Sequence, residues 1–474
     1  MRHAMLASVL TAALALPLAA QRAESLSAGV RQFVSVDAPV VALTHVRVID
    51  GTGAAAKGDQ TVLIANGVIS AVGPSASTPA PDGAKVIDLT GASVIPGLVM
   101  VHEHLFYPAG GLALYTEQAF SFPRLYLAGG VTTMRTGGSM EPYTDLNLKR
   151  MIETGAQPGP HIDVTGPYLE HSDLFYQVHP LNGAEDARRT VAYWADLGAT
   201  SFKAYMHITR AELGAAIAEA HKRGLKVTGH LCSVTFHEAA ALGIDNLEHG
   251  LMPASDFVEG KVPDECPPAG VTASLVALDT AGEPMRALIR DLVAHKVAIT
   301  STLTIFETFT PGRQTVKQPV LDAMLSDARQ SYLTNRARVL EAPSSPYPAL
   351  LKKTMVFERE FVRAGGLLLV GTDPTGFGGV IAGYSNQRAL ELLVEAGFSP
   401  IEAIAIATSN GARYLGRDKI GTIAVGKNAD LVVVRGDPSV RITDIERMET
   451  VFKDGVGYDS AKLFAAVKGI VGLK

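Results

Sequence analysis

Cysteine is scarce in this sequence, because only Cys232 and Cys266 occur among its 474 residues. Two cysteines cannot form the dense disulfide framework of a small secreted domain, so that class of protein is excluded. Cys232 lies two residues after His230, in a segment that also carries candidate site residues. We expect both thiols to be free.

An excess of charge of one sign is also missing. The 42 Lys and Arg residues nearly balance the 47 Asp and Glu residues, and the net charge is -5. We therefore expect neither nucleic acid nor an acidic membrane surface as a partner. With 47% hydrophobic and 19% charged residues, the composition is that of a globular protein of one large and one smaller domain.

Long apolar runs are absent after residue 20. The run at residues 4–20 follows Arg2 and His3 and ends on the small residues Ala19 and Ala20. This is the pattern of a secretory signal peptide, and the run is short for a membrane anchor. We expect residues 1–20 to be a signal peptide, the mature protein to be periplasmic or secreted, and no membrane contact after cleavage.

Both ends of the mature chain have the pattern of β-structure. Their runs are β-branched or alternate in polarity, with Asp-Gly and Asn-Gly turns between them. These runs are 40–53, 61–74, 85–97, 421–438 and 451–455. We predict that segments 38–95 and 419–474 join as one small β-sandwich domain.

Between these segments, short apolar strands alternate with amphipathic helical stretches. After the strand that leads to His102, further strands are expected at 131–138, 161–166, 200–206, 226–231, 246–250, 298–303 and 367–374. Helix candidates that end at a glycine are 184–198, 209–224 and 386–397. This alternation predicts an α/β fold, a (β/α)8 TIM barrel over 96–418. A doubly wound sheet is the alternative, and the placement of polar residues argues against it.

Five of the expected strands end in residues that are unusual for an apolar run. These residues are His102 and His104 on the first strand, Lys203 on the fourth, His230 on the fifth, His249 on the sixth and Asp373 on the eighth. In a barrel, the C-terminal ends of the strands meet at one mouth, where active sites are built. Each residue alone is a weak signal, but burying so many polar groups together is costly without a purpose. A metal centre supplies that purpose.

The spacing of the histidines fits metal binding. Residues i and i+2 of an extended segment face the same side, so His102 and His104 can bind one ion while Glu103 faces away. His230 and His249 can serve a second ion, and Asp373 adds an anionic oxygen. Nitrogen and oxygen ligands of this kind suit Zn²⁺ or a similar divalent metal.

Lys203 favours two ions over one. An ammonium that points at cations is destabilised and loses its proton. A neutral amine can react with carbon dioxide to give a carbamate, a bidentate anion that can bridge two metals. We therefore expect two divalent ions, Zn²⁺ by preference, and a carboxylated Lys203.

These motifs together resemble the amidohydrolase superfamily of metal-dependent hydrolases. The segment 96–104, PGLVMVHEH, resembles its first-strand signature, and Lys203, His230, His249 and Asp373 match its later ligands in order. Segments 46–53 and 421–434 resemble its terminal β segments, so the resemblance covers about residues 38 to 460. It implies a homo-oligomer and a small-molecule amide substrate.

The segment 129–139, GGVTTMRTGGS, resembles the imidazolonepropionase-like and prolidase-like branch. Enzymes of this branch are often exported and cleave the amide before a C-terminal amino acid, and some cleave toxins such as ochratoxin. In that branch an Asp commonly follows the Arg, whereas Thr136 follows Arg135 here. This departure puts the usual support of the Arg in doubt.

The resemblance implies a hydroxide that bridges the two metals. Asp373 would accept the proton of the attacking water and deliver it to the leaving nitrogen. We name three candidate substrate contacts. Tyr205 could donate a hydrogen bond to the carbonyl oxygen, and Arg135 could pair with a substrate carboxylate. His171 lies in the loop after the third strand and could lie near the substrate. Each has an alternative: packing for Tyr205, His179 in the place of His171, and a structural salt bridge for Arg135.

The remaining histidines lie at strand starts or on helix faces, and we interpret them as structural or solvated. They include His161, His221, His237 and His295. The Gly-rich segment 374–386 has no phosphate-loop spacing, so no nucleotide site is expected.

Three functions compete on these observations. The leading one is an exported, binuclear amide hydrolase acting on dipeptides or N-acyl amino acids. The second is a mononuclear deaminase or cyclic-amide hydrolase of the same superfamily, against which Lys203 argues. The third is a non-catalytic periplasmic protein that binds metal or solute, which the intact ligand set with Asp373 disfavours.

Overall fold

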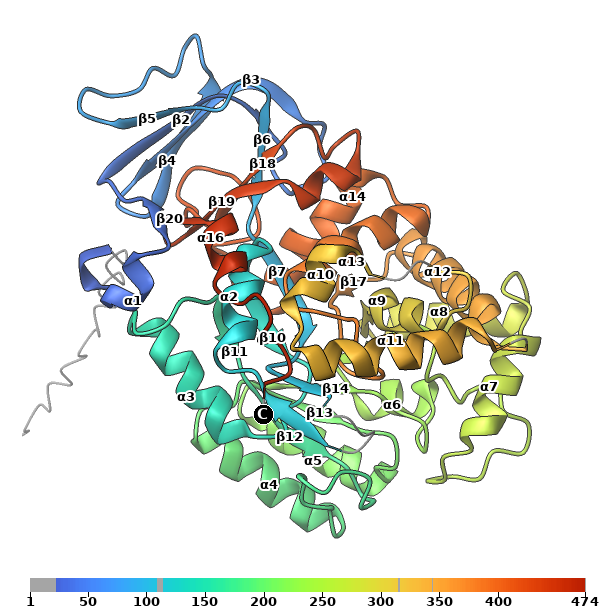
Figure 1. Cartoon of the computed structure of the whole chain (residues 1–474). Helices are drawn as coiled ribbons and strands as arrows, with labels where there is room; N and C mark the ends of the chain where they lie inside the picture. Colours follow the sequence, from blue (N-terminus) through green and yellow to red (C-terminus); the bar gives the residue numbers. More distant parts are fainter. Residues whose placement is uncertain (1–22, 109–113, 314–315, 343, 474) are drawn as a thin grey trace, which may run out of the picture.

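The computed structural model describes residues 23–108, 114–313, 316–342 and 344–473 (Figure 1). The expected signal peptide, residues 1–20, lies outside the described residues. Within the described ranges, no helix combines the length and the apolar character needed to cross a membrane.

Strands from both ends of the chain form one nine-stranded sheet, which lies at the top left of Figure 1. Its order is β1 (Val34–Val36), β20 (Val456–Asp459), β19 (Met448–Lys453), β18 (Leu431–Arg435), β6 (Ala92–Pro96), β2 (Val40–Val48), β3 (Lys57–Ala65) and β4 (Val68–Pro74), with β5 (Lys85–Asp88) on β2. The key junction is β18 against β6, antiparallel with Val433 opposite Val94. The sheet has its own apolar core, which includes Leu43, Val62 and Phe452.

The strands between these segments are parallel and form two sheets. One has the order β11 (His161–Asp163), β10 (Val131–Thr136) and β7 (Leu98–Glu103). The other has the order β12 (Thr165–Leu169), β13 (Ser201–Ala204), β14 (Lys226–Gly229), β15 (Asn246–Glu248), β16 (Ala298–Ser301) and β17 (Leu368–Val370). Every expected strand is therefore present, and the third is divided at Val164.

The two parallel sheets meet at both of their ends. Only Val164 separates β11 from β12 along the chain. On the other side, the amides of Thr372 and Asp373, just after β17, donate to the carbonyl of His102 on β7 (3.1 and 3.2 Å). The α/β class is confirmed. The strands form separate sheets in place of one continuous ladder, and the terminal strands form one sheet, so a closed barrel and a β-sandwich stay predictions.

The crossing from the terminal sheet to the parallel strands occurs at Gly97. β6 ends at Pro96 and β7 begins at Leu98. A Cβ atom on Gly97 would lie 2.1 Å from the hydroxyl oxygen of Thr132, so only glycine allows this close approach of β7 to β10.

Helices follow most of the parallel strands and surround them in Figure 1. They are α2 (Ser121–Ala128), α3 (Pro142–Glu153), α4 (Ala184–Asp196), α5 (Arg210–Lys222), α6 (Phe236–Leu242), α7 (Pro268–Ala277), α8 (Glu283–Ala294), α9 (Leu303–Phe309), α10 (Gln318–Ala323), α11 (Ser326–Leu340), α12 (Tyr347–Arg363), α13 (Tyr384–Glu395), α14 (Pro400–Ala405) and α15 (Gly411–Tyr414). Short helices α1 (Ala28–Arg31) and α16 (Ser460–Ala465) flank the terminal strands. Capping boxes begin α5 at Thr209 and α6 at Thr235, where the N-cap hydroxyl and a glutamate three residues later satisfy the free amides.

Candidate metal centre

The six side chains expected to bind metal lie together at the C-terminal ends of five strands. The Nε2 atom of His102 lies 3.1 Å from Lys203 Nζ and 3.7 Å from Asp373 Oδ1. His104 Nε2 is 3.1 Å from the same carboxylate oxygen. The rings of His249 and His102 are 4.6 Å apart.

His230 completes the cluster through its ring. Its centroid lies 4.4 Å from that of His249. One tight group of possible metal ligands consists of His102, His249 and Asp373. This group takes one histidine from each of the two pairs that the sequence assigned to separate ions.

Left-handed backbone at two strand ends turns the ligands inward. His249 has φ 70° and Asp373 has φ 55°. In a regular strand, Glu248 and His249 would face opposite sides. The left-handed turn at His249 instead lets both side chains contact the same cluster, at a backbone conformation that non-glycine residues rarely adopt.

Three imidazoles of the centre, those of His104, His230 and His249, have lowered pKa values. Burial lowers the pKa of His104 to about 4 and that of His230 to about 3, with help from the charge of Lys203. Burial and the neighbouring His230 also lower the pKa of His249 well below its usual range. A neutral imidazole is the form that binds a metal ion.

The pKa values of both Lys203 and Asp373 are lowered, which favours the neutral amine and the charged carboxylate. Burial lowers the pKa of Lys203 to about 8, which increases the fraction of neutral amine near pH 7. Burial alone would raise the pKa of Asp373, but the hydrogen bond from His104 and the nearby His102 and His249 outweigh it and lower that pKa well below 3.8. Asp373 is therefore a buried carboxylate.

The hydrogen bonds on the far side of two rings determine which nitrogen faces the centre. His102 Nδ1 donates to Glu248 Oε2 (2.7 Å), and His104 Nδ1 donates to the carbonyl of Gly138 (3.2 Å). The Nε2 atoms of both rings then face Asp373. His249 Nε2 is buried and has no hydrogen-bond partner among the described residues.

A divalent cation fits this arrangement. Two imidazoles and a carboxylate, all buried, direct nitrogen and oxygen atoms at one another, and a cation among them would satisfy these atoms. Imidazole nitrogen and carboxylate oxygen are ligands that Zn²⁺ accepts. The donor set thus supports the expected metal centre by its own chemistry.

Glu248 is a functional residue that the sequence analysis missed. It is fully buried and contacts both His102 and the guanidinium of Arg135 (Nη1–Oε1 3.2 Å). Burial opposes ionisation, but the neighbouring His102 and Arg135 lower the pKa of Glu248 well below 4.5. The sequence offered one signal for this role, because Glu248 directly precedes the strand-end residue His249.

Glu103 faces away from the ligands, as expected. Its carboxyl group accepts hydrogen bonds from Thr372 and from Asn386 Nδ2 (3.0 Å). Burial raises its pKa to about 8.

Arg135 does not face a substrate. It is 1% exposed, and its donors bind Ser201 Oγ (2.8 Å), Thr228 Oγ1 (2.9 Å), Glu248 and the carbonyl of Val101. The structure therefore places Arg135 in a structural ion pair, which was the alternative that the sequence left open. The predicted contact between Arg135 and a substrate carboxylate is wrong. Glu248 takes the place of the acidic partner that Thr136 cannot provide.

The two other candidate substrate contacts are placed differently. Tyr205 stacks near the centre, with its ring 4.7 Å from that of His230, and packs against Tyr168 at 5.0 Å. His171 is half-exposed and donates to Glu212 at the start of α5 (2.8 Å). Tyr205 is therefore adjacent to the metal ligands, whereas His171 anchors its loop to a helix.

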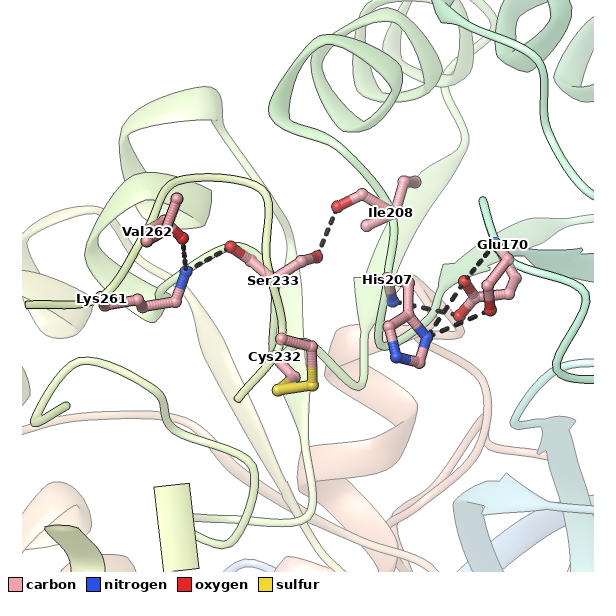
Figure 2. The surroundings of a disulfide bond; sticks show 9 residues. Glu170, His207, Ile208, Cys232, Ser233, Lys261 and Val262 are labelled. Atoms are coloured by element: carbon pink, nitrogen blue, oxygen red, sulfur yellow. Dashed lines mark hydrogen bonds and ion pairs between the residues drawn. A yellow bond between two sulfur atoms is a disulfide. The ribbon is translucent and has the colours of Figure 1, made fainter. Parts of the chain in front are cut away.

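The expectation of free thiols is wrong, because Cys232 and Cys266 form a disulfide. Figure 2 shows Cys232 next to Ser233, whose hydroxyl donates to the carbonyl of Ile208 (2.6 Å). Lys261 also donates to the carbonyl of Ser233. The disulfide and these hydrogen bonds thus hold the segment after His230 in place. The two cysteines pair because the folded chain brings them close together, and their spacing along the sequence does not reveal this.

The remaining histidines contact carboxylate side chains away from the centre. His221 contacts Asp245 (2.9 Å), His237 contacts Asp256 (2.6 Å) and His295 contacts Asp291 (3.2 Å). His179 contacts Asp186 (3.0 Å), so it does not substitute for His171. These contacts agree with structural or solvated roles.

Comparison with known proteins gives a consistent assignment. A family model described as "Amidohydrolase family" matches residues 93–458. The imidazolonepropionase of Salinispora tropica is 35% identical over 91 residues, which is 19% of this chain and only 22% of that relative's length. The imidazolonepropionase of Salinispora arenicola is 25% identical over 379 residues, 79% of this chain and 85% of the relative.

Solved structures extend the match to nearly the whole chain. A Bifidobacterium longum protein assigned as a prolidase is 26% identical, with a TM-score of 0.65 over 90% of this chain and 98% of that one. The A. niger ochratoxinase shares the fold at 17% identity, with a TM-score of 0.65 over 90% of this chain and 95% of that one.

Proposed function

The chain belongs to the amidohydrolase family, and we propose that it is an exported binuclear metal-dependent hydrolase that cleaves the amide bond of a dipeptide or N-acyl amino acid. One observation carries the proposal: the buried side chains of His102, His104 and Asp373 converge, with Asp373 Oδ1 3.7 Å from His102 Nε2 and 3.1 Å from His104 Nε2.

The six residues His102, His104, Lys203, His230, His249 and Asp373 would hold two divalent ions, Zn²⁺ by preference. When bound, the ions supply a water of lowered pKa and polarise the substrate carbonyl. Carboxylation of Lys203 would give the bridging anion, and the lowered pKa of its amine supports this.

Asp373 would move the proton. It is ionised and lies among the ligands, so it can accept a proton from the attacking water and pass it to the leaving amine. Its hydroxyl donor Thr375 (3.0 Å) fixes the orientation of the carboxylate.

Tyr205 would bind the substrate. Burial raises its pKa well above 10, so its hydroxyl stays protonated and can donate to the carbonyl oxygen. The wall formed by Tyr205, Tyr168 and Phe175 makes an apolar or aromatic group next to that carbonyl suitable. An ochratoxin-like amide fits the same description, in line with the fold shared with an ochratoxinase.

A panel of N-acyl amino acids and dipeptides, incubated with Zn²⁺-loaded protein, tests the reaction. We expect hydrolysis of at least one apolar member, and loss of about 100-fold or more in kcat on Asp373→Asn. Wild-type turnover by the variant would contradict the proton-transfer role. Silence of the loaded wild type on the panel would favour the binding protein.

A cyclic amide is the second candidate substrate, because the relatives with 35% and 25% identity are imidazolonepropionases. The same panel should therefore contain a cyclic amide and an aminopurine. Release of ammonia or ring opening, without hydrolysis of the linear amides, would select this mononuclear alternative.

Lys203→Ala tests the two-metal arrangement. The variant should retain less metal than the roughly two ions per chain expected of the centre. The conservative Lys203→Arg variant, which keeps the charge but cannot be carboxylated in the same way, should show the same loss. Unchanged stoichiometry in both would contradict the bridging carbamate.

We also propose a periplasmic or secreted location, a closed (β/α)8 barrel over 96–418 and a terminal β-sandwich domain. The Cys232–Cys266 disulfide supports export, because disulfides persist in oxidising compartments. Determination of the N-terminus of the mature protein from the host tests export: we expect a start after Ala20, and an intact Met1 in the cytoplasmic fraction would contradict it. The homo-oligomer stays a prediction, which sedimentation can test.

A further inference from the structure

A second cluster of possible metal ligands lies far from the hydrolytic residues along the chain. It consists of His161, Asp430 and Asp454, whose ligand atoms all lie within 4.8 Å of one another. His161 begins β11, Asp430 immediately precedes β18, and Asp454 lies in the turn between β19 and β20. His161 begins a parallel strand, whereas the hydrolytic ligands follow the ends of such strands, so the cluster lies at the opposite edge.

A buried carboxylate oxygen of Asp430 lacks a hydrogen-bond partner among the described residues, which indicates a bound ligand. Its side chain is only 3% exposed, and its Oδ1 atom accepts a hydrogen bond from the amide of Asp454 (2.8 Å). Its Oδ2 atom is buried and has no partner among the described residues. A buried carboxylate oxygen without a donor is energetically unfavourable, and a bound cation would remove this cost.

The other two residues point their ligand atoms at the same space. His161 Nε2 lies 3.0 Å from Asp454 Oδ2 and 3.1 Å from Asp454 Oδ1. Both side chains are partly exposed, so an ion can reach the cluster from solvent.

One cation lies next to the cluster. Lys453 Nζ is 3.6 Å from Asp454 Oδ2, and it offsets one carboxylate. Arg417 is paired with Asp163 (Nε–Oδ2 3.1 Å). Within the described residues, no cationic side chain forms a hydrogen bond with Asp430 Oδ2.

We propose that His161, Asp430 and Asp454 form a separate divalent-metal site that links the nine-stranded sheet to the parallel strands. One imidazole and two carboxylates suit Zn²⁺ or a similar ion, with water in the remaining position. Bound metal would satisfy Asp430 Oδ2 and connect β11 to β18 and to the β19–β20 turn. The site is structural, and it is independent of the proposed hydrolysis.

Metal content tests the site in the full mature protein. Wild type, Asp430→Asn and Asp163→Asn are dialysed against the same free Zn²⁺ and analysed by mass spectrometry for zinc per chain. We expect Asp430→Asn to hold about one ion fewer than wild type. The matched control Asp163→Asn, next to the cluster but paired with Arg417, should hold as much as wild type.

Equal zinc in wild type and Asp430→Asn would overturn the proposal. The difference does not depend on how many ions the hydrolytic centre holds, and amide hydrolysis should be unchanged in Asp430→Asn. Failure of this site and failure of the proposed function are therefore distinguishable.

A second variant covers the case in which Asp430→Asn does not fold. His161→Ala alters a partly exposed side chain, and it should also hold about one ion fewer. If His161→Ala keeps the zinc of wild type, His161 is only a charged partner of Asp454, and the site is refuted.

Discussion

Two buried glutamates, Glu103 and Glu248, lie beside the metal ligands in opposite protonation states. Burial raises the pKa of Glu103 to about 8, so it is mostly protonated at pH 7. Burial has the same effect on Glu248, but His102 and Arg135 outweigh it and keep Glu248 ionised. Both carboxyl groups are fully buried, so their different charges result from their different neighbours.

Glu248→Gln should weaken metal binding. The carboxylate receives the Nδ1 hydrogen of His102 and so directs Nε2 of that ring toward the centre. We expect the affinity for Zn²⁺ to fall by about 10–100-fold. Competition with a chromophoric chelator measures this change.

Glu103→Gln is the matched control. It replaces a buried glutamate on the same strand as His102, and the amide resembles the protonated carboxyl group already present near pH 7. Its zinc affinity should stay near that of wild type. Equal losses in both variants would mean that burial of any glutamine here disturbs the centre.

At the scale of elements, helix α12 carries a buried acid against the parallel strands. Glu358 accepts a hydrogen bond from Ser301 at the end of β16 (2.9 Å), while its Oε1 atom has no partner among the described residues. Burial raises the pKa of Glu358 from 4.5 to about 8. The folded chain therefore binds a proton more tightly than the unfolded chain at this position.

The stability of the wild type should fall as pH rises from about 5 to 8, because the native state holds the Glu358 proton that the unfolded state releases. The contribution is fully present below pH 4.5 and is lost as pH passes through 8. Glu358→Gln should flatten this part of the profile. Urea midpoints at several pH values measure it, and parallel profiles for both proteins would contradict the assignment.

The disulfide joins the segment after β14 to the segment before α7. Its cysteines are 34 residues apart, so the closed loop restricts the unfolded chain substantially. The replacement of both by serine should lower the free energy of unfolding by about 3–4 kcal/mol. Denaturant unfolding with and without a reductant measures it: the reductant should affect wild type and leave the double variant unchanged.

At the scale of the whole molecule, the candidate metal ligands come from five strands between His102 and Asp373. Ions bound to all of them would favour the folded chain over the unfolded one, since the unfolded chain cannot bring these residues together. The proposed centre would therefore couple metal binding to folding.

Removal of metal with a chelator should lower the Tm by several degrees and abolish amide hydrolysis. At free Zn²⁺ about 100 times Kd, bound metal stabilises the folded state by about 3 kcal/mol. Calorimetry before chelation, after chelation and after return of Zn²⁺ measures this. A Tm that does not respond to Zn²⁺ would contradict the metal centre.

The sequence by itself determined the α/β class, the strands and the order of the six candidate ligands. Short apolar runs between helical patterns indicate strands because their period is local, and a polar residue at the end of such a run is visible without a structure. His102 and His104 share a face for the same local reason, and Glu103 faces away.

Only the tertiary structure decided the partners across the chain. Glu248 contacts His102 and Arg135, which come from two other strands, and no local pattern predicts these contacts. Cys232 and Cys266 pair because two loops meet, and Asp430 meets His161 because the terminal sheet packs against the parallel strands. Such contacts depend on the packing of segments distant in sequence, whereas strand periodicity depends only on neighbouring residues.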